Sequence, residues 1–174
     1  IKDYPSTENF GDERKNYYKE DIYVGYRYFE SFAKDKVLYP FGFGLSYTAF
    51  EISSAVADVS EDAITVESVV KNTGDAAGKE VVEVYAQAPQ GMLGKPSRVL
   101  AGFAKTQVIA PGEEERVTIV IPKKVYASYD DSGVTGHKDS FLLEAGSYKI
   151  YVGADVRSAA LAGSYEQELK VIEQ

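Results

Sequence analysis

From Tyr47 onward, short stretches of alternating apolar and polar residues are separated by turn sequences. A period of two is typical of strands that bury one face, and it is clearest at Val117, Ile119 and Ile121. Turns are expected at 72–75, 110–113, 144–146 and 163–164, because each contains a residue that favours turn backbone. The pattern predicts seven strands, at 47–59, 63–72, 79–88, 98–108, 113–121, 147–153 and 165–172.

Seven short strands without alternating helices predict an all-β fold. The expected arrangement is an immunoglobulin or fibronectin type III-like antiparallel β-sandwich, in which two sheets bury the side chains between them. The positions expected in its core are Val82, Val84, Val117, Ile119, Ile150 and Val152.

Aromatic residues are concentrated near the start of the chain, where the first 50 positions hold 14 of the 22 Tyr and Phe residues. This stretch lacks strand alternation, although a helix is expected at 20–32. So short a segment cannot bury that much apolar surface by itself. Residues 1–46 are therefore interpreted as an interdomain strap, which needs the sandwich or a further domain as a second surface, and 47–174 as the sandwich domain.

Seven residues of the strap and its junction with the sandwich are expected to contact another domain: Tyr23, Tyr26, Arg27, Tyr28, Phe41, Phe43 and Tyr47. Alternatively, exposed rings stack on sugars, which would make the chain an independent carbohydrate- or protein-binding β-sandwich module. The number of rings and the glycines between them favour packing between domains. Glycan-array or affinity-gel binding would favour the module.

Composition excludes several classes of protein. The chain has no cysteine, so a disulfide framework and a thiolate metal site are both excluded. A net charge of −8 without a basic cluster argues against a nucleic acid partner. No apolar run is long enough to span a membrane, so no membrane partner is expected. The chain begins at Ile1 rather than Met and is expected to be a piece of a longer protein.

Six sequence blocks resemble, in their order, the fibronectin type III-like part of glycoside hydrolase family 3 enzymes and its junction with the preceding domain. They are DIYVGYRYF at 21–29, YPFGFGLSYT at 39–48, GKEVVEVY at 78–85, RVLAGF at 98–103, APGE at 110–113 and LEAGSYKIYVG at 143–153. The resemblance covers nearly the whole chain from Tyr17. Phe141 departs from the family pattern, in which Trp is common, and the loop after Tyr129 is longer than in many members.

The resemblance implies that 1–46 is the tail of an α/β sandwich domain, followed by a fibronectin type III-like domain. It implies a parent enzyme, most simply a β-glucosidase, that hydrolyses terminal β-linked sugars with retention. The family's aspartate nucleophile lies in a (β/α)8 barrel and its usual glutamate acid/base in the α/β sandwich domain. Neither motif appears here, so no catalytic residue, cofactor or metal is assigned. The implied partners are the barrel and the α/β sandwich domain of the same enzyme, and a carbohydrate substrate is contacted through the parent enzyme. The long loop resembles those of bacterial members in which the barrel follows the fibronectin type III-like domain. A bacterial cytoplasm is the favoured compartment.

The predicted loop at 122–141 contains Asp130, Asp131 and His137. Retaining glycoside hydrolysis needs two carboxyl groups about 5–5.5 Å apart. Adjacent residues on a strand point to opposite faces, so this pair is poorly placed to act on one bond. A turn in which Asp accepts hydrogen bonds from backbone amides is favoured, with contact between this loop and another domain as a further role. His137 lacks the Gly-x-Ser-x-Gly sequence of a hydrolase nucleophile and is expected to face solvent.

Overall fold

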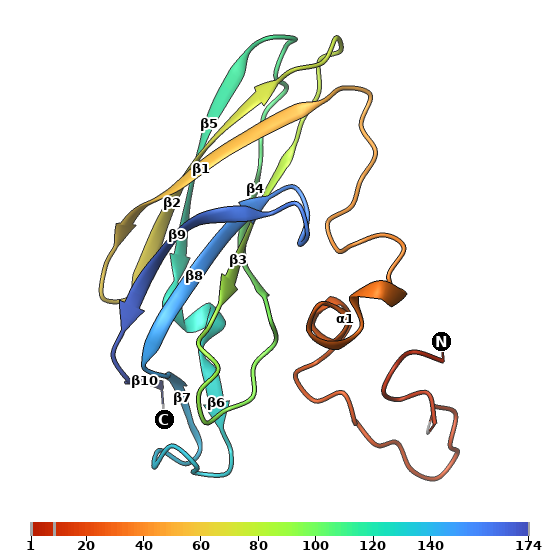
Figure 1. Ribbon diagram of the computed structural model, residues 1–174, viewed down its shortest axis with the longest axis vertical. Coiled ribbons are helices and arrows are strands. Elements are labelled where there is room, and N and C mark those ends of the chain that lie inside the picture. Colours follow the sequence, from red (N-terminus) through yellow and green to blue (C-terminus); the bar gives the residue numbers. More distant parts are fainter. Residues whose placement is uncertain (1, 9, 174) are drawn as a thin grey trace.

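The computed structural model is an antiparallel β-sandwich with a long N-terminal segment lying beside it (Figure 1). It describes residues 2–8 and 10–173, and only the backbone of 55–57. One sheet has the order β1-β2-β5 and the other β4-β3-β8-β9. The strands are β1 (Phe50–Val59), β2 (Ala63–Asn72), β3 (Val81–Gln87), β4 (Val99–Lys105), β5 (Glu114–Pro122), β8 (Gly146–Gly153) and β9 (Ala160–Gln167). The all-β sandwich expected from the sequence is confirmed.

A third, smaller sheet closes one end of the sandwich. Its order is β10-β7-β6, formed by β10 (Lys170–Glu173), β7 (Ser140–Leu143) and β6 (Ser128–Asp130), and the short helix η2 (Lys123–Tyr126) leads into it. The prediction of one long loop at 122–141 is wrong, as is that of a single strand at 165–172. Strands of three or four residues are too short to display a period of two, so the sequence pattern does not distinguish them from loop.

The core lies between the two larger sheets. All six positions predicted for it are buried: Val82, Val84, Val117, Ile119, Ile150 and Val152. Strand β5 alternates regularly between exposed and buried residues, as its sequence indicated. Gly102 on β4 lets the sheets approach closely, because a Cβ at this position would lie 3.0 Å from Ile121 Cγ1.

Asn72 fastens the end of the N-terminal segment to the sandwich. Its side-chain amide donates hydrogen bonds to the carbonyls of Ala76 and Ile109, at 2.8 and 2.9 Å. Its side-chain oxygen accepts bonds from the Thr48 hydroxyl and from the Gly74 amide. Since Asn72 is fully buried, these bonds satisfy a polar group that would otherwise destabilise the fold.

The N-terminal segment contains the helix α1 (Tyr26–Phe32) and the short helix η1 (Lys34–Lys36), with turns elsewhere. The predicted helix at 20–32 is therefore wrong over its first six residues. Asp21 and Gly25 adopt left-handed backbone, with φ angles of 49° and 59°, which a right-handed helix does not allow. Helix α1 begins directly after Gly25.

Candidate domain-docking strap and groove

Tyr26 joins the strap, residues 2–46, to the outer face of the sheet that contains β3 and β4. Its ring stacks on Phe41 with centroids 4.5 Å apart and meets Tyr85 edge-on at 6.3 Å. Its hydroxyl accepts a hydrogen bond of 2.8 Å from the Leu100 amide. Tyr85 projects from β3 away from the main core yet is fully buried, so a second, smaller hydrophobic cluster lies under the strap.

The strap makes its closest backbone approach at Gly42. The Val156 amide donates a hydrogen bond of 3.0 Å to the carbonyl of Phe41. Gly42 has a φ of 90°, and a Cβ there would lie 2.4 Å from a carboxylate oxygen of Glu83. Only glycine fits this position without displacing its neighbours. Burial raises the pKa of Glu83, although the hydrogen bond from the Tyr85 hydroxyl opposes that effect.

A charged contact also anchors helix α1 to the sandwich. Glu30 is 4% exposed, and its carboxylate accepts a hydrogen bond of 2.9 Å from Nε of Arg157. The same guanidinium donates to the carbonyl of Lys34 at 2.8 Å. The Ser31 hydroxyl accepts a bond from the Ser97 amide at 2.9 Å. The helix is thus anchored to two separate loops of the sandwich, one after β3 and one after β8.

Much of the strap consists of exposed aromatic and aliphatic side chains, and these, with the adjoining Tyr47, are called the exposed face. Tyr47 is fully exposed, and the Phe43 ring contacts only that of Tyr39 among the described rings. Tyr28 packs against Phe29 and Phe32 within the helix. The exposed large apolar residues of the strap, together with the adjoining Tyr47, are Tyr4, Phe10, Tyr17, Tyr18, Ile22, Val24, Phe32, Leu38, Tyr39, Phe41, Phe43, Leu45 and Tyr47.

The seven residues predicted to dock against another domain therefore divide into three groups. Tyr26 contacts the sandwich through its side chain and Phe41 through its backbone carbonyl, Tyr23 and Arg27 line a groove, and the remaining three, Tyr28, Phe43 and Tyr47, lie in the helix or on the exposed face. That these residues contact a further domain remains a prediction.

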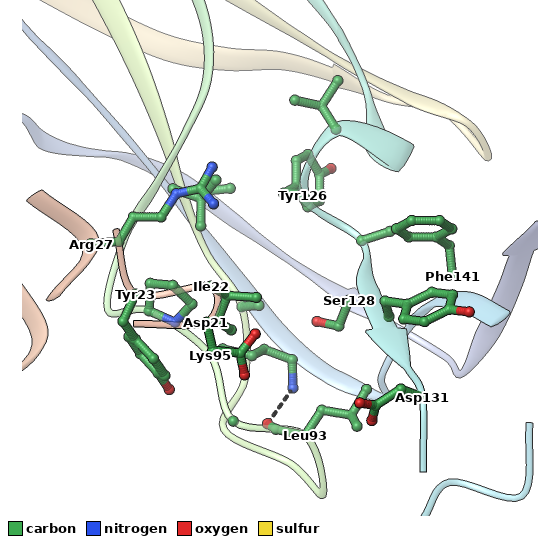
Figure 2. A pocket seen from close by; sticks show the side chains of 18 residues that line it. Asp21, Ile22, Tyr23, Arg27, Leu93, Lys95, Tyr126, Ser128, Asp131 and Phe141 are labelled. Carbon is green, nitrogen blue, oxygen red and sulfur yellow. Dashed lines mark hydrogen bonds between the residues drawn. The ribbon is translucent and has the colours of Figure 1, made fainter. Parts of the chain in front are cut away.

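The groove has a volume of about 370 Å³ and lies between the strap and the end of the sandwich (Figure 2). Asp21, Tyr23 and Arg27 stand on the strap side, while Ser128 and Phe141 stand on the opposite wall. The rings of Tyr129 and Phe141 are cross-strand partners on β6 and β7, with centroids 4.9 Å apart. Aromatic and charged groups thus face one space.

Asp130 and Asp131 occupy different environments, as expected for a turn rather than a catalytic pair. Asp130 is fully buried, and its carboxylate accepts hydrogen bonds from the amides of Gly133, Val134 and Thr135. Burial raises the pKa of Asp130, but these bonds and those from the Ser132 and Thr135 hydroxyls outweigh it and hold the pKa well below its usual range. Asp131 is exposed at the edge of the groove. His137, expected to face solvent, is partly exposed.

Sequence reasoning missed a buried ion pair that shapes the groove. Lys95 and Glu144 are 4% and 6% exposed at their side chains, and the ammonium group bonds directly to the carboxylate. The same carboxylate accepts bonds from the amides of Met92 and Leu93, at 2.6 and 3.2 Å. Burial raises the pKa of Glu144, but the hydrogen bonds from Lys95, Met92 and Leu93 outweigh this effect and hold the pKa below its usual value. The partners lie 49 residues apart, so no local pattern signals the pair.

Within residues 2–8 and 10–173, no three or more His, Asp or Glu side chains group in a way that would hold a metal ion. The helices in this part of the chain are too short or too polar to cross a membrane.

Comparison with known proteins identifies the relatives of this chain. The family described as Fn3-like, fibronectin type III-like domain, matches residues 80–156. A β-glucosidase of Ruminococcus albus is 53% identical over 175 residues, which include all of this chain and 18% of the relative. The solved β-glucosidase of Paenibacillus barengoltzii superposes with a TM-score of 0.93 at 49% identity, over 100% of this chain and 20% of that one.

The solved GH3 β-glucosidase of Bifidobacterium adolescentis is 32% identical, with a TM-score of 0.85 over 97% of this chain and 24% of that one. The chain is homologous to one part of glycoside hydrolase family 3 β-glucosidases. It corresponds to the part of family 3 β-glucosidases that contains the fibronectin type III-like domain, which confirms the resemblance seen in the sequence blocks. The chain spans about a fifth of the length of these relatives.

Proposed function

We propose that this chain is an accessory structural part of a family 3 β-glycosidase, and that it braces the catalytic domains rather than performing chemistry. The observation that carries the proposal is that specific contacts fix the strap to the sandwich while many of its apolar side chains are exposed. Tyr26, Glu30 and Gly42 make these contacts. The exposed face includes the rings of Phe43 and Tyr47. A surface held rigidly and left apolar is suited to a further protein surface.

The occupants proposed for the exposed face are the α/β sandwich domain and the (β/α)8 barrel of the same enzyme. In this proposal, 1–46 is the tail of the α/β sandwich domain and 47–174 is the fibronectin type III-like domain. The relatives are several times longer than this chain, which supports the presence of further protein beyond it. Residues at the junction contribute to both domains, so movement between them would disrupt the second hydrophobic cluster around Tyr85.

For the whole protein we propose hydrolysis of terminal β-linked sugars with retention, with a β-glucoside as the preferred substrate. The relatives named as β-glucosidases support this activity. A retaining mechanism requires a nucleophile and an acid/base on either side of the bond. Asp130 is used as a buried structural acceptor, and Asp131 is exposed, so this adjacent pair is not arranged for that task.

The test introduces Phe43→Ser with Tyr47→Ser into both this chain and the full-length enzyme. In the chain alone we expect the melting temperature to change little, because both side chains are exposed. In the full-length enzyme we expect a lower melting temperature and reduced hydrolysis of nitrophenyl β-glucoside. Phe103→Ser serves as the control, since Phe103 is also exposed but lies on β4 outside the strap.

An effect of the same size in both proteins would contradict the proposal, because it would show that the two rings stabilise only this chain. A full-length enzyme unaffected by the double substitution would contradict it as well. If the full-length enzyme hydrolyses no β-glycoside, the proposed activity is disproved. The bracing role would then be judged from the melting temperatures alone.

A further inference from the structure

Three charged side chains around the groove have no partner among residues 2–8 and 10–173. Arg27 and Asp21 lie on the strap and Asp131 lies on the opposite side, as Figure 2 shows. None of these three side chains makes a hydrogen bond or ion pair with another residue in the described part of the chain. Lys95, by contrast, is bonded to Glu144 and to the carbonyl of Leu93. The groove therefore offers one guanidinium and two carboxylates to a ligand.

An aromatic surface adjoins these charges. Tyr129 and Phe141 stand opposite each other on β6 and β7, and their exposed fractions are 48% and 44%. Their rings contact each other at 4.9 Å, which limits the freedom of both. Two half-exposed rings that are already ordered can bind an apolar face with little further loss of side-chain entropy.

This combination of groups restricts the chemistry of the ligand. Pyranose rings with equatorial hydroxyl groups have apolar C–H faces that stack on aromatic rings, and hydroxyls that bond to carboxylates and guanidinium groups. Anionic ligands are disfavoured, because the groove has two free carboxylates against one free cation and the chain carries a net charge of −8. A volume of about 370 Å³ lies within the range of small-molecule sites, roughly 300–1,000 Å³.

We propose that the groove between the strap and the β6–β7 hairpin binds a short, neutral oligosaccharide of β-linked gluco- or xylo-configured pyranoses. Phe141 and Tyr129 stack on a sugar ring, while Arg27 and Asp131 bond to its hydroxyls from opposite sides. This binding is independent of the bracing role, because it uses the inner groove rather than the exposed face of the strap.

The test is a titration of the ¹⁵N-labelled chain with cellotriose and with xylotriose, followed by NMR. We expect saturable shifts of amide signals in β6, β7 and residues 21–27 with at least one of the two sugars. Phe141→Ala should lower the affinity about tenfold, which corresponds to about 1.4 kcal/mol of stacking. Asp131→Asn should lower it by a smaller factor, because an amide is a weaker acceptor than a carboxylate.

Phe103→Ala is the matched control, since it removes an exposed ring from β4 and should leave the affinity unchanged. Amide spectra of each variant establish that the sandwich is still folded. The absence of saturable shifts with both sugars would overturn the proposal, as would binding that survives Phe141→Ala. If neither sugar binds but Phe43→Ser with Tyr47→Ser still destabilises only the full-length enzyme, the bracing function stands. Failures of the two proposals are therefore distinguishable.

Discussion

The hydroxyl of Tyr26 accepts a hydrogen bond of 2.8 Å from the backbone amide of Leu100, which lies 74 residues further along the chain. The bond joins the first turn of α1 to strand β4. Tyr26 also supplies the ring that partly covers Tyr85, so one side chain positions the strap through both a polar and an apolar contact.

Tyr26→Phe should loosen the strap without unfolding the sandwich. The ring contacts remain, but the Leu100 amide loses its acceptor, which should lower the free energy of unfolding by about 1 kcal/mol. Hydrogen exchange measures the local effect, and faster exchange at residues 26–33 and at Leu100 is expected. Unchanged exchange at these amides would contradict the role given to the hydroxyl. Tyr129→Phe is the control, because the Tyr129 side chain is half-exposed and its hydroxyl makes no hydrogen bond with residues 2–8 or 10–173.

Ile119→Ala should destabilise the sandwich by about 2–5 kcal/mol, because Ile119 is 7% exposed and lies in the main core. Its neighbour Val120 is 63% exposed, so Val120→Ala should change the stability by no more than about 0.5 kcal/mol. Urea unfolding of the two variants checks the assignment of faces on β5. Equal losses from both substitutions would show that the assignment is wrong.

Lys95→Met should destabilise the chain by about 3–5 kcal/mol, since it leaves the buried carboxylate of Glu144 without its cation. The double variant Lys95→Met with Glu144→Gln should recover part of this loss, because the charge is removed while the remaining side-chain oxygen can still accept the hydrogen bond from the Met92 amide. Chemical unfolding of the three proteins provides the comparison. A double variant less stable than Lys95→Met alone would be inconsistent with an uncompensated charge.

The loop after β6 should lose stability in acid. The pKa of Asp130 is lower in the folded state than in the unfolded chain, so its contribution to stability is complete above the unfolded value, about 4, and is lost as the pH falls through the folded one. Asp130→Asn should therefore be less stable than the native chain at neutral pH, and the difference should shrink below about pH 4. Thermal melting across this range tests the expectation, and a difference that does not vary with pH would refute it.

The isolated chain should hydrolyse no aryl β-glycoside, whereas the full-length enzyme should. The resemblance to family 3 places the nucleophile and the acid/base in other domains, and both must be held together at the scissile bond. Nitrophenyl β-glucoside and β-xyloside are suitable substrates for assaying the two proteins. Turnover by the chain that survives repurification and disappears in Asp131→Asn would contradict the structural role proposed here.

Much of the fold was predictable because its signals are local. The alternation at Val117 and Ile119 reports which face of β5 is buried, and it depends only on neighbours along one strand. The turn at Asp130 was also predictable, since its carboxylate bonds to amides within five residues. The ordered sequence blocks supplied the family. The beginning of α1 was not predicted, because the left-handed backbone at Asp21 interrupts the acidic start that the sequence favoured.

The sequence by itself determined the sandwich, the identity of its core positions and the family, because strand periodicity and turn chemistry act over a few residues. Only the tertiary structure decided which strap rings are covered and which are exposed, and which charges are paired. Tyr26 meets Leu100, and Lys95 meets Glu144, across 74 and 49 residues. Contacts of that length depend on how the sheets and loops are arranged in space, and no periodicity along the chain encodes them.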